Sequence, residues 1–127
     1  SAMIYGIGTD IVNISRFKKM KSIKSFSEKI LSEDEIKICS TFNEEKLIKY
    51  LAKQFACKEA LSKAFGTGIR KPILFKELEI LRDENGKPYF NPLGDVKKTL
   101  INLGITKTHV SLADESEHAI AFAILEI

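Results

Sequence analysis

Gln54–Gly68, with the sequence QFACKEALSKAFGTG, decides the fold of this chain because it predicts the end of a long helix and the glycine turn that follows it. Upstream of it, apolar residues recur at helical spacing and define one buried face: Ile48, Leu51, Ala52 and Phe55. At roughly 100° per residue, the same face continues through Glu59, Ser62 and Lys63. A carboxylate therefore stands where an apolar side chain is expected.

Glu59 needs a partner, because burying an unpaired carboxylate is strongly unfavourable. The structural explanation is an ion pair with Lys63, which follows four residues along the helix in the favourable orientation. The functional explanation is a metal or catalytic role for the carboxylate. Helix geometry alone leaves both explanations open.

The composition is that of an ordinary globular protein. The length of 127 residues suits one domain, and 44% apolar with 29% charged residues is typical of soluble proteins. No apolar run is long enough to span a membrane and the N-terminus has no signal pattern, so we expect a cytoplasmic protein without a membrane partner. Ser1-Ala2 is interpreted as a tag remnant before Met3. Cys39 and Cys57 lack metal-ligand spacing and suit a reducing compartment.

Met3–Val12, MIYGIGTDIV, predicts a strand rich in β-branched residues. Gly6, Gly8 and Asp10 share one face of it at period two. Glycines beside an aspartate leave room for another group to come close. Asp10 is therefore a candidate functional residue, although a residue that ends the strand or helps to cap the next helix would look the same.

A basic cluster follows this strand. Residues 11–27 contain no acid but hold Arg16, Lys18, Lys19, Lys21 and Lys24. Charge runs are usually solvated faces, but the lack of interspersed acids favours an acidic partner. Only Phe17 interleaves with the cluster, so nucleic acid is not indicated. A non-catalytic module that docks acidic proteins and a small RNA-binding domain are the alternatives to an enzyme.

Cap signals place the next two helices. Ser32 and Glu35 predict a capping box, which accounts for the local carboxylates without a function, and Asn43 caps the long helix. That helix ends near Phe65. Gly66-Thr67-Gly68 then permits left-handed backbone and exposed amides that can hold an anion, although glycine is also common at helix C-caps.

The second half predicts a hairpin, a helix and two strands. The hairpin pairs Glu77–Arg82 with Pro88–Asn91 through an Asn-Gly turn, and the helix covers Leu93–Leu103. The strands cover Lys107–Ala113, which carries His109, and His118–Ile127, whose two apolar faces predict a central position. The order predicts one α+β domain over residues 3–127, an antiparallel sheet packed by one long and several short helices.

Three separated segments together resemble one family. GIGTDIV (6–12), FACKEALSKAFGTGI (55–69) and HVSLAD (109–114) are similar to motifs of the small single-domain bacterial 4′-phosphopantetheinyl transferases, the holo-acyl-carrier-protein synthases. The resemblance implies Mg²⁺-dependent transfer of phosphopantetheine from coenzyme A to a serine of apo-acyl carrier protein, in fatty acid synthesis. Adenosine 3′,5′-bisphosphate is the other product. It also implies that family's fold and a homotrimer with active sites between subunits.

The resemblance assigns residues by motif. It implies that Asp10 and Glu59 bind the metal, a hard cation that prefers oxygen ligands, and that Lys63 neutralises the diphosphate. The coenzyme A contacts that it implies are Lys58 at the rim, Lys63, Gly66, Thr67, Gly68 and His109. Arg16, Lys18, Lys19, Lys21 and Lys24 would dock an acidic helix of the carrier protein. The base that takes the serine proton stays open between Glu59 and a metal-bound water.

Two positions depart from the family pattern. Gln54 stands where many relatives have arginine, so one phosphate contact is expected to be lost or moved to Lys53. Asn13 stands where many relatives have glutamate, a change that removes no metal ligand.

Overall fold

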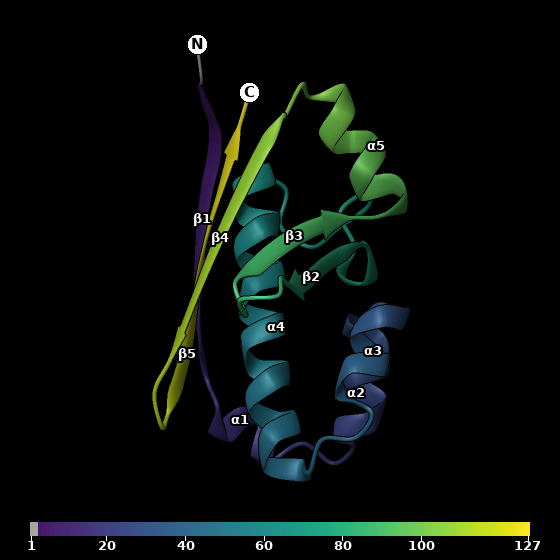
Figure 1. The fold of residues 1–127 in the computed structure, drawn as a ribbon, viewed down its shortest axis with the longest axis vertical. Helices are drawn as coiled ribbons and strands as arrows, with labels where there is room; N and C mark the ends of the chain where they lie inside the picture. The colour runs from purple at the N-terminus through teal and green to yellow at the C-terminus, as the bar shows by residue number, and fades with distance from the viewer. Residues whose placement is uncertain (1–2) are drawn as a thin grey trace.

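The computed structural model describes residues 3–127, and its centre is a long helix enclosed between two layers (Figure 1). The Ser1-Ala2 pair, interpreted as a tag remnant, lies outside the described residues. The first layer is an antiparallel sheet of β1 (Ile4–Asn13), β5 (His118–Glu126) and β4 (Lys107–Asp114), in the order β1-β5-β4. The final strand therefore lies centrally, as its apolar sequence predicts. The α+β class is confirmed.

The helix α4 (Glu44–Phe65) packs across the inner face of this sheet, over β1 and β5 (Figure 1). It begins at the cap predicted, because the Asn43 side chain accepts a hydrogen bond from the Lys46 amide. It ends at Gly66, whose φ of 85° is left-handed. Its buried residues include Leu51, Ala60 and Leu61, so the predicted apolar face is part of a wider buried surface.

The second layer covers the other side of α4 (Figure 1). It contains α2 (Ile23–Ile30), α3 (Glu33–Cys39), the short 3₁₀ turn η1 (Phe75–Glu77) and the hairpin of β2 (Leu78–Arg82) with β3 (Pro88–Pro92). The short helix α1 (Ser15–Lys18) follows β1, and α5 (Gly94–Asn102) connects β3 to β4. The predicted Ser32–Glu35 capping box is present at the start of α3. Burial of α4 on both sides is why polar side chains on it need partners.

Glycines of β1 allow direct contact between this strand and α4. Gly6 lies against the backbone of Ala64, and Gly8 against the backbone of Ala60. A methyl group at either glycine would overlap a main-chain carbonyl of the helix. Alternation along the strand then directs Asp10 to the same side, beside α4.

Two further expectations from the sequence concern the cysteines and the lack of a membrane-spanning segment. Cys39 and Cys57 are both free and buried, and burial raises the pKa of the Cys57 thiol to about 12. Within residues 3–127, none of the helices combines the length and the apolar character needed to cross a bilayer.

Candidate functional site

Asp10 and Lys63 meet where β1 crosses the last turns of α4. The Lys63 Nζ lies 3.0 Å from Asp10 Oδ1 and 3.0 Å from the main-chain oxygen of Thr9. The Asp10 side chain is only 15% exposed, whereas that of Lys63 is 50% exposed. A largely buried carboxylate on the strand is thus compensated by a cation that reaches it from the solvent side.

Glu59 lies one turn before Lys63 on α4 and belongs to the same site. Desolvation raises the pKa of its carboxyl group, and the negative charge of Asp10 raises it further, while Lys63 and Arg16 oppose the shift. The effect of Asp10 means that two residues 49 positions apart in the sequence are near enough for their charges to interact. Among the ion pairs of residues 3–127, Lys63 pairs with Asp10 and not with Glu59, so the structural explanation of Glu59 is not realised.

The donor chemistry of this site fits Mg²⁺. Two carboxylates destabilise one another's charged form, and a hard cation between them would relieve that repulsion. Asp10 and Glu59 could supply its oxygen ligands. With few protein ligands, such an ion keeps positions for water and phosphate oxygens.

Arg16 extends the site on the side of α1. Its guanidinium carbon lies 5.2 Å from the centroid of the Phe55 ring, which places a cation over an aromatic face one turn before Glu59. Its charge reaches Glu59, where it lowers the pKa. The sequence assigned Arg16 only to partner docking, and its nearness to the carboxylates could not be seen from the basic run. The neighbouring Lys18, Lys19, Lys21 and Lys24 are exposed.

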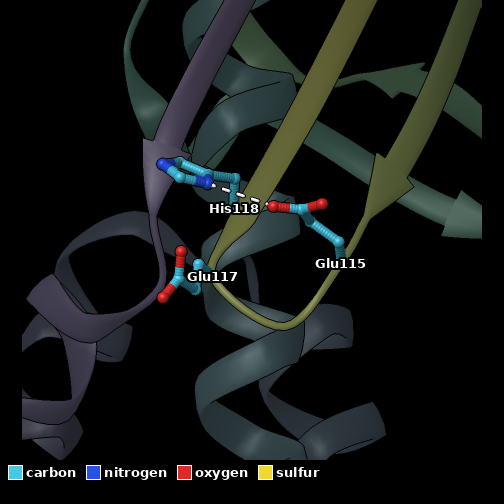
Figure 2. A group of neighbouring side chains, drawn as sticks. All are labelled: Glu115, Glu117 and His118. Carbon is cyan, nitrogen blue, oxygen red and sulfur yellow. Dashed lines mark hydrogen bonds and ion pairs between the residues drawn. The ribbon is translucent and has the colours of Figure 1, made fainter.

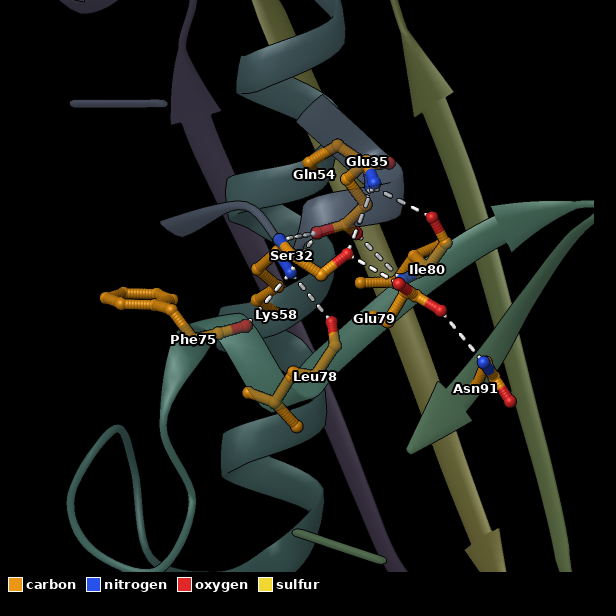
Figure 3. Close-up of polar contacts among 9 residues, drawn as sticks. All are labelled: Ser32, Glu35, Gln54, Lys58, Phe75, Leu78, Glu79, Ile80 and Asn91. Atoms are coloured by element: carbon orange, nitrogen blue, oxygen red, sulfur yellow. Dashed lines mark hydrogen bonds and ion pairs between the residues drawn. The ribbon is translucent and has the colours of Figure 1, made fainter. Parts of the chain in front are cut away.

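Lys58 does not line a rim, which corrects the role expected for it. Its side chain is 0% exposed and its Nζ donates to Glu35 Oε1 at 2.8 Å, Phe75 O at 3.0 Å and Leu78 O at 2.8 Å (Figure 3). All three ammonium protons are therefore engaged. Burial lowers the pKa of Lys58, and the Glu35 carboxylate opposes this. The reason for the error is that Lys58 faces the second layer, away from β1.

Gln54 belongs to the same buried cluster. Its Nε2 donates to Glu35 Oε2 at 2.7 Å and to Ile80 O at 3.1 Å (Figure 3). Position 54 thus points into the core rather than toward a ligand. The Lys53 Nζ lies 3.9 Å from Asp114 Oδ1, so Lys53 is paired with a carboxylate of β4. This pairing does not support the expected transfer of a phosphate contact to Lys53.

The Gly66-Thr67-Gly68 turn caps α4 with its own amides. The Thr67 and Gly68 amides both donate to Ser62 O, at 3.2 and 3.1 Å, and the Gly66 amide donates to Lys63 O at 2.9 Å. The expectation of exposed amides is therefore wrong, because these donors complete the helix C-cap. The space around the turn is open, since a Cβ at Gly66 or Gly68 would meet nothing within 4 Å.

His109 is not brought together with Asp10 and Glu59 within one chain. It pairs with Ile124 in the register of β4 and β5 and lies on the outer face of the sheet, opposite α4. Its Nε2 is 3.6 Å from Glu126 Oε2. Exposed apolar side chains share this outer face: Ile7, Ile11, Ile120 and Phe122.

One group of potential ligands escaped the sequence analysis. Glu115, Glu117 and His118, on the turn between β4 and β5, have ligand atoms within 4.8 Å of one another, and His118 Nδ1 is 3.3 Å from Glu115 Oε1 (Figure 2). The close spacing of two glutamates and a histidine was the available signal. A cavity of about 350 Å³ adjoins Glu115 and His118. The short hairpin turn brings the two glutamates beside His118, the first residue of β5, which accounts for their proximity.

Comparisons with known proteins cover nearly the whole chain. Residues 6–123 match the 4′-phosphopantetheinyl transferase superfamily. A holo-[acyl-carrier-protein] synthase of Ruthia magnifica subsp. Calyptogena magnifica is 44% identical over 126 residues, 98% of each chain. The crystal structure of the Neisseria meningitidis synthase has a TM-score of 0.88 at 38% identity, with 97% and 98% covered. That of the Bacillus anthracis synthase in complex with CoA (3′,5′-ADP) has a TM-score of 0.84 at 35% identity, with 98% and 97% covered.

Proposed function

This chain belongs to the 4′-phosphopantetheinyl transferase superfamily, and from that premise we propose that it acts as a holo-[acyl-carrier-protein] synthase. It transfers 4′-phosphopantetheine from coenzyme A to a serine of apo-acyl carrier protein. The serine oxygen bonds to the β-phosphorus, the bond to the bridging oxygen breaks, and adenosine 3′,5′-bisphosphate leaves. The observation that carries this assignment to particular residues is the contact of Lys63 with Asp10, with Glu59 one turn earlier on α4 and within reach of both charges.

We assign the metal to Asp10 and Glu59. Bound there, Mg²⁺ would supply charge stabilisation at the phosphate oxygens. The two carboxylates would hold the ion from β1 and from α4, and the close packing of Gly8 on Ala60 fixes the separation of these elements. The half-exposed Lys63 supplies positive charge toward the diphosphate, so that electrostatic stabilisation and positioning account for most of the acceleration.

Glu59 is the group in this chain that we assign to accept the serine proton. A base must lie within hydrogen-bond reach of the serine hydroxyl, and Glu59 projects from α4 one turn before Lys63, the cation that we place at the diphosphate. Arg16 presents a second cation beside the reacting groups. With Glu59 as the catalytic carboxylate and Lys63 as the catalytic cation, the polar residues on this face of α4 are explained.

The substrate contacts follow from the surfaces around these residues. The open surface of Gly66, Thr67 and Gly68 adjoins the end of α4 near Lys63, so coenzyme A would lie against it by shape rather than through its amides. The exposed basic side chains of α1 and the segment after it suit the acidic surface of a carrier protein. They are Arg16, Lys18, Lys19, Lys21 and Lys24.

A homotrimer with active sites between subunits would complete the site. The outer sheet face carries exposed Ile7, Ile11, Ile120 and Phe122, an apolar surface that another copy can cover. His109 lies on that face, so a neighbouring copy, and not the same chain, would bring it to coenzyme A. A role in fatty acid synthesis and a cytoplasmic location follow from the substrates, and two buried free cysteines agree with a reducing compartment.

Mass spectrometry of apo-acyl carrier protein tests the assignment directly. Incubation with this chain, coenzyme A and Mg²⁺ should add one phosphopantetheine to one serine. Asp10→Asn and Glu59→Gln should abolish the Mg²⁺-dependent addition while the circular dichroism spectrum stays native. Binding of carrier protein that is indifferent to coenzyme A and Mg²⁺, with no mass added, would instead identify a docking module.

A further inference from the structure

A buried polar cluster holds α4 on the side opposite the proposed active site. The Glu35 carboxylate, 0% exposed, accepts four hydrogen bonds: Oε1 from the Ser32 amide and Lys58 Nζ, both at 2.8 Å, and Oε2 from Gln54 Nε2 at 2.7 Å and the Ile80 amide at 2.8 Å (Figure 3). One carboxylate of α3 thus joins two successive turns of α4 to β2. A side chain with every acceptor site engaged has little freedom to move.

The other side of α4 cannot fix the rotation of the helix in the same way. There, Gly6 and Gly8 lie against the backbone of Ala64 and Ala60, so the strand places no side chain on the helix at these two positions. This contact sets how close the strand and the helix lie, but these positions offer no side-chain ridge that would resist rotation. The Lys63 contact with Asp10 is half exposed, and a cation at Asp10 would compete with it. The directional hydrogen bonds from Gln54 and Lys58 to Glu35 therefore constrain rotation of the helix more specifically than the glycine contacts do.

Rotation of α4 matters for the carboxylates. Glu59 directly follows Lys58, and the two side chains leave the helix about 100° apart, so the anchoring of one fixes the direction of the other. For a helix of about 5–6 Å radius with side chains, a rotation of about 10° moves an outer atom by about 1 Å. A misplacement of about 1 Å can cost about 100-fold in rate.

The cluster also supports Arg16. Lys58 Nζ holds the main-chain oxygen of Phe75, whose ring lies 5.7 Å from that of Phe55. Phe55 in turn carries the Arg16 guanidinium. The same ammonium group therefore fixes the backbone beneath the aromatic pair on which a cation of the site rests.

We propose that Glu35 is a positioning residue for the transfer reaction: by holding Gln54 and Lys58, it fixes the rotation of α4 that presents Glu59 to Asp10. The inference rests on the proposed function. The effect of Glu35 should appear in the factor by which Mg²⁺ increases the affinity for coenzyme A, the Mg²⁺-dependent gain, measured by calorimetry with and without Mg²⁺. A loss of stability alone does not change the affinity of the molecules that remain folded.

Glu35→Gln should reduce that gain about 10- to 100-fold, the range typical of groups that orient metal ligands. Glu79→Gln is the matched control. Glu79 is similarly buried in the cluster, but its carboxylate accepts from Ser32 Oγ and Asn91 Nδ2 and, among the residues the structure describes, has no hydrogen bond to α4 (Figure 3). The Ser32 hydroxyl can accept from the new amide, so the control should retain a gain within about twofold of the wild type.

A second variant keeps the test decisive if Glu35→Gln fails to fold. Glu35→Gln combined with Lys58→Gln removes both charges, so neither is left buried without a partner. The double variant should also show a reduced gain at native circular dichroism. A wild-type gain in either folded variant overturns the positioning role, and failure of both to fold assigns the cluster to stability alone and overturns it as well. If Mg²⁺ does not increase the affinity of the wild type for coenzyme A, the proposed function itself is overturned.

Discussion

Gly8→Ala should separate β1 from α4 and uncouple the two carboxylates. The new Cβ would lie 2.8 Å from Ala64 N and 2.9 Å from Ala60 C, and it would overlap the Ala60 carbonyl oxygen. Carbon contacts are favourable at about 3.5–4.0 Å, so the contact with Ala60 C alone requires a separation of roughly 0.6–1.1 Å, and the overlap with the carbonyl oxygen makes this a lower bound. Asp10 lies two residues further along the same face and moves with the strand.

The expected result is a loss of transfer rate of about 100-fold, as for other displacements of about 1 Å. The free energy of unfolding should fall by about 1–3 kcal/mol, the usual range for an overpacked contact. Rates would be measured by mass spectrometry of the carrier protein, and stability by urea denaturation.

Gly86→Ala is the control for stability. Gly86 lies in the β2–β3 turn with φ of 81°, and a Cβ there meets nothing within 4 Å. The left-handed conformation costs about 1–2 kcal/mol in an L-residue, so the variant loses a similar stability without moving β1. It should retain the wild-type rate. A wild-type rate in Gly8→Ala, with unchanged Mg²⁺ dependence, would refute the link between the glycine contact and the site.

Four further outcomes are expected. Lys63→Met should slow transfer about 100- to 1000-fold, the range for loss of one stabilising group, and should also lower the urea midpoint, because the largely buried Asp10 carboxylate loses its counter-ion. Glu59→Gln should stabilise the metal-free protein at pH values above the raised pKa of Glu59. Between the ordinary and the raised pKa, the folded wild type binds more protons than the unfolded chain, so the stability of the wild type falls as pH rises. Urea denaturation should show that the stability difference between variant and wild type vanishes under acidic conditions. Lys19→Glu with Lys21→Glu should raise KM for the carrier protein and weaken its salt dependence, while kcat stays near wild type. Phe122→Lys should yield smaller oligomers in light scattering and a lower transfer rate, and an unchanged mass would exclude this face as the subunit interface.

The sequence predicts elements well where local chemistry determines them. Asn43 accepts the hydrogen bond that starts α4, the Asn-Gly turn joins β2 and β3, and the doubly apolar final strand lies in the centre of the sheet. The sequence also singled out Asp10, a carboxylate beside glycines on a strand, and Glu59, a carboxylate on a buried helix face, as residues that need a partner. Only the family resemblance placed the two together, and their shared role stays a prediction.

The errors arose where a local explanation hid a distant contact. Glu35 completes a capping box, which seemed to account for its charge, yet its carboxylate also neutralises Lys58, 23 residues away. Lys58 was therefore expected at the surface. The glycine turn was expected to expose its amides, but the C-terminal carbonyls of α4 take them first. Both errors come from hydrogen-bond partners that the one-dimensional sequence does not place.

The contact between Lys63 and Asp10 gives the protein an internal counter-ion that can be exchanged. A divalent ion bound at Asp10 would compete with the ammonium group for the same carboxylate, so its affinity would be lower than two bare carboxylates would provide. A lysine displaced from Asp10 would be free to follow the incoming phosphates, which would favour loading of metal and nucleotide together. An enzyme arranged in this way would release its ion with its product instead of retaining it between turnovers.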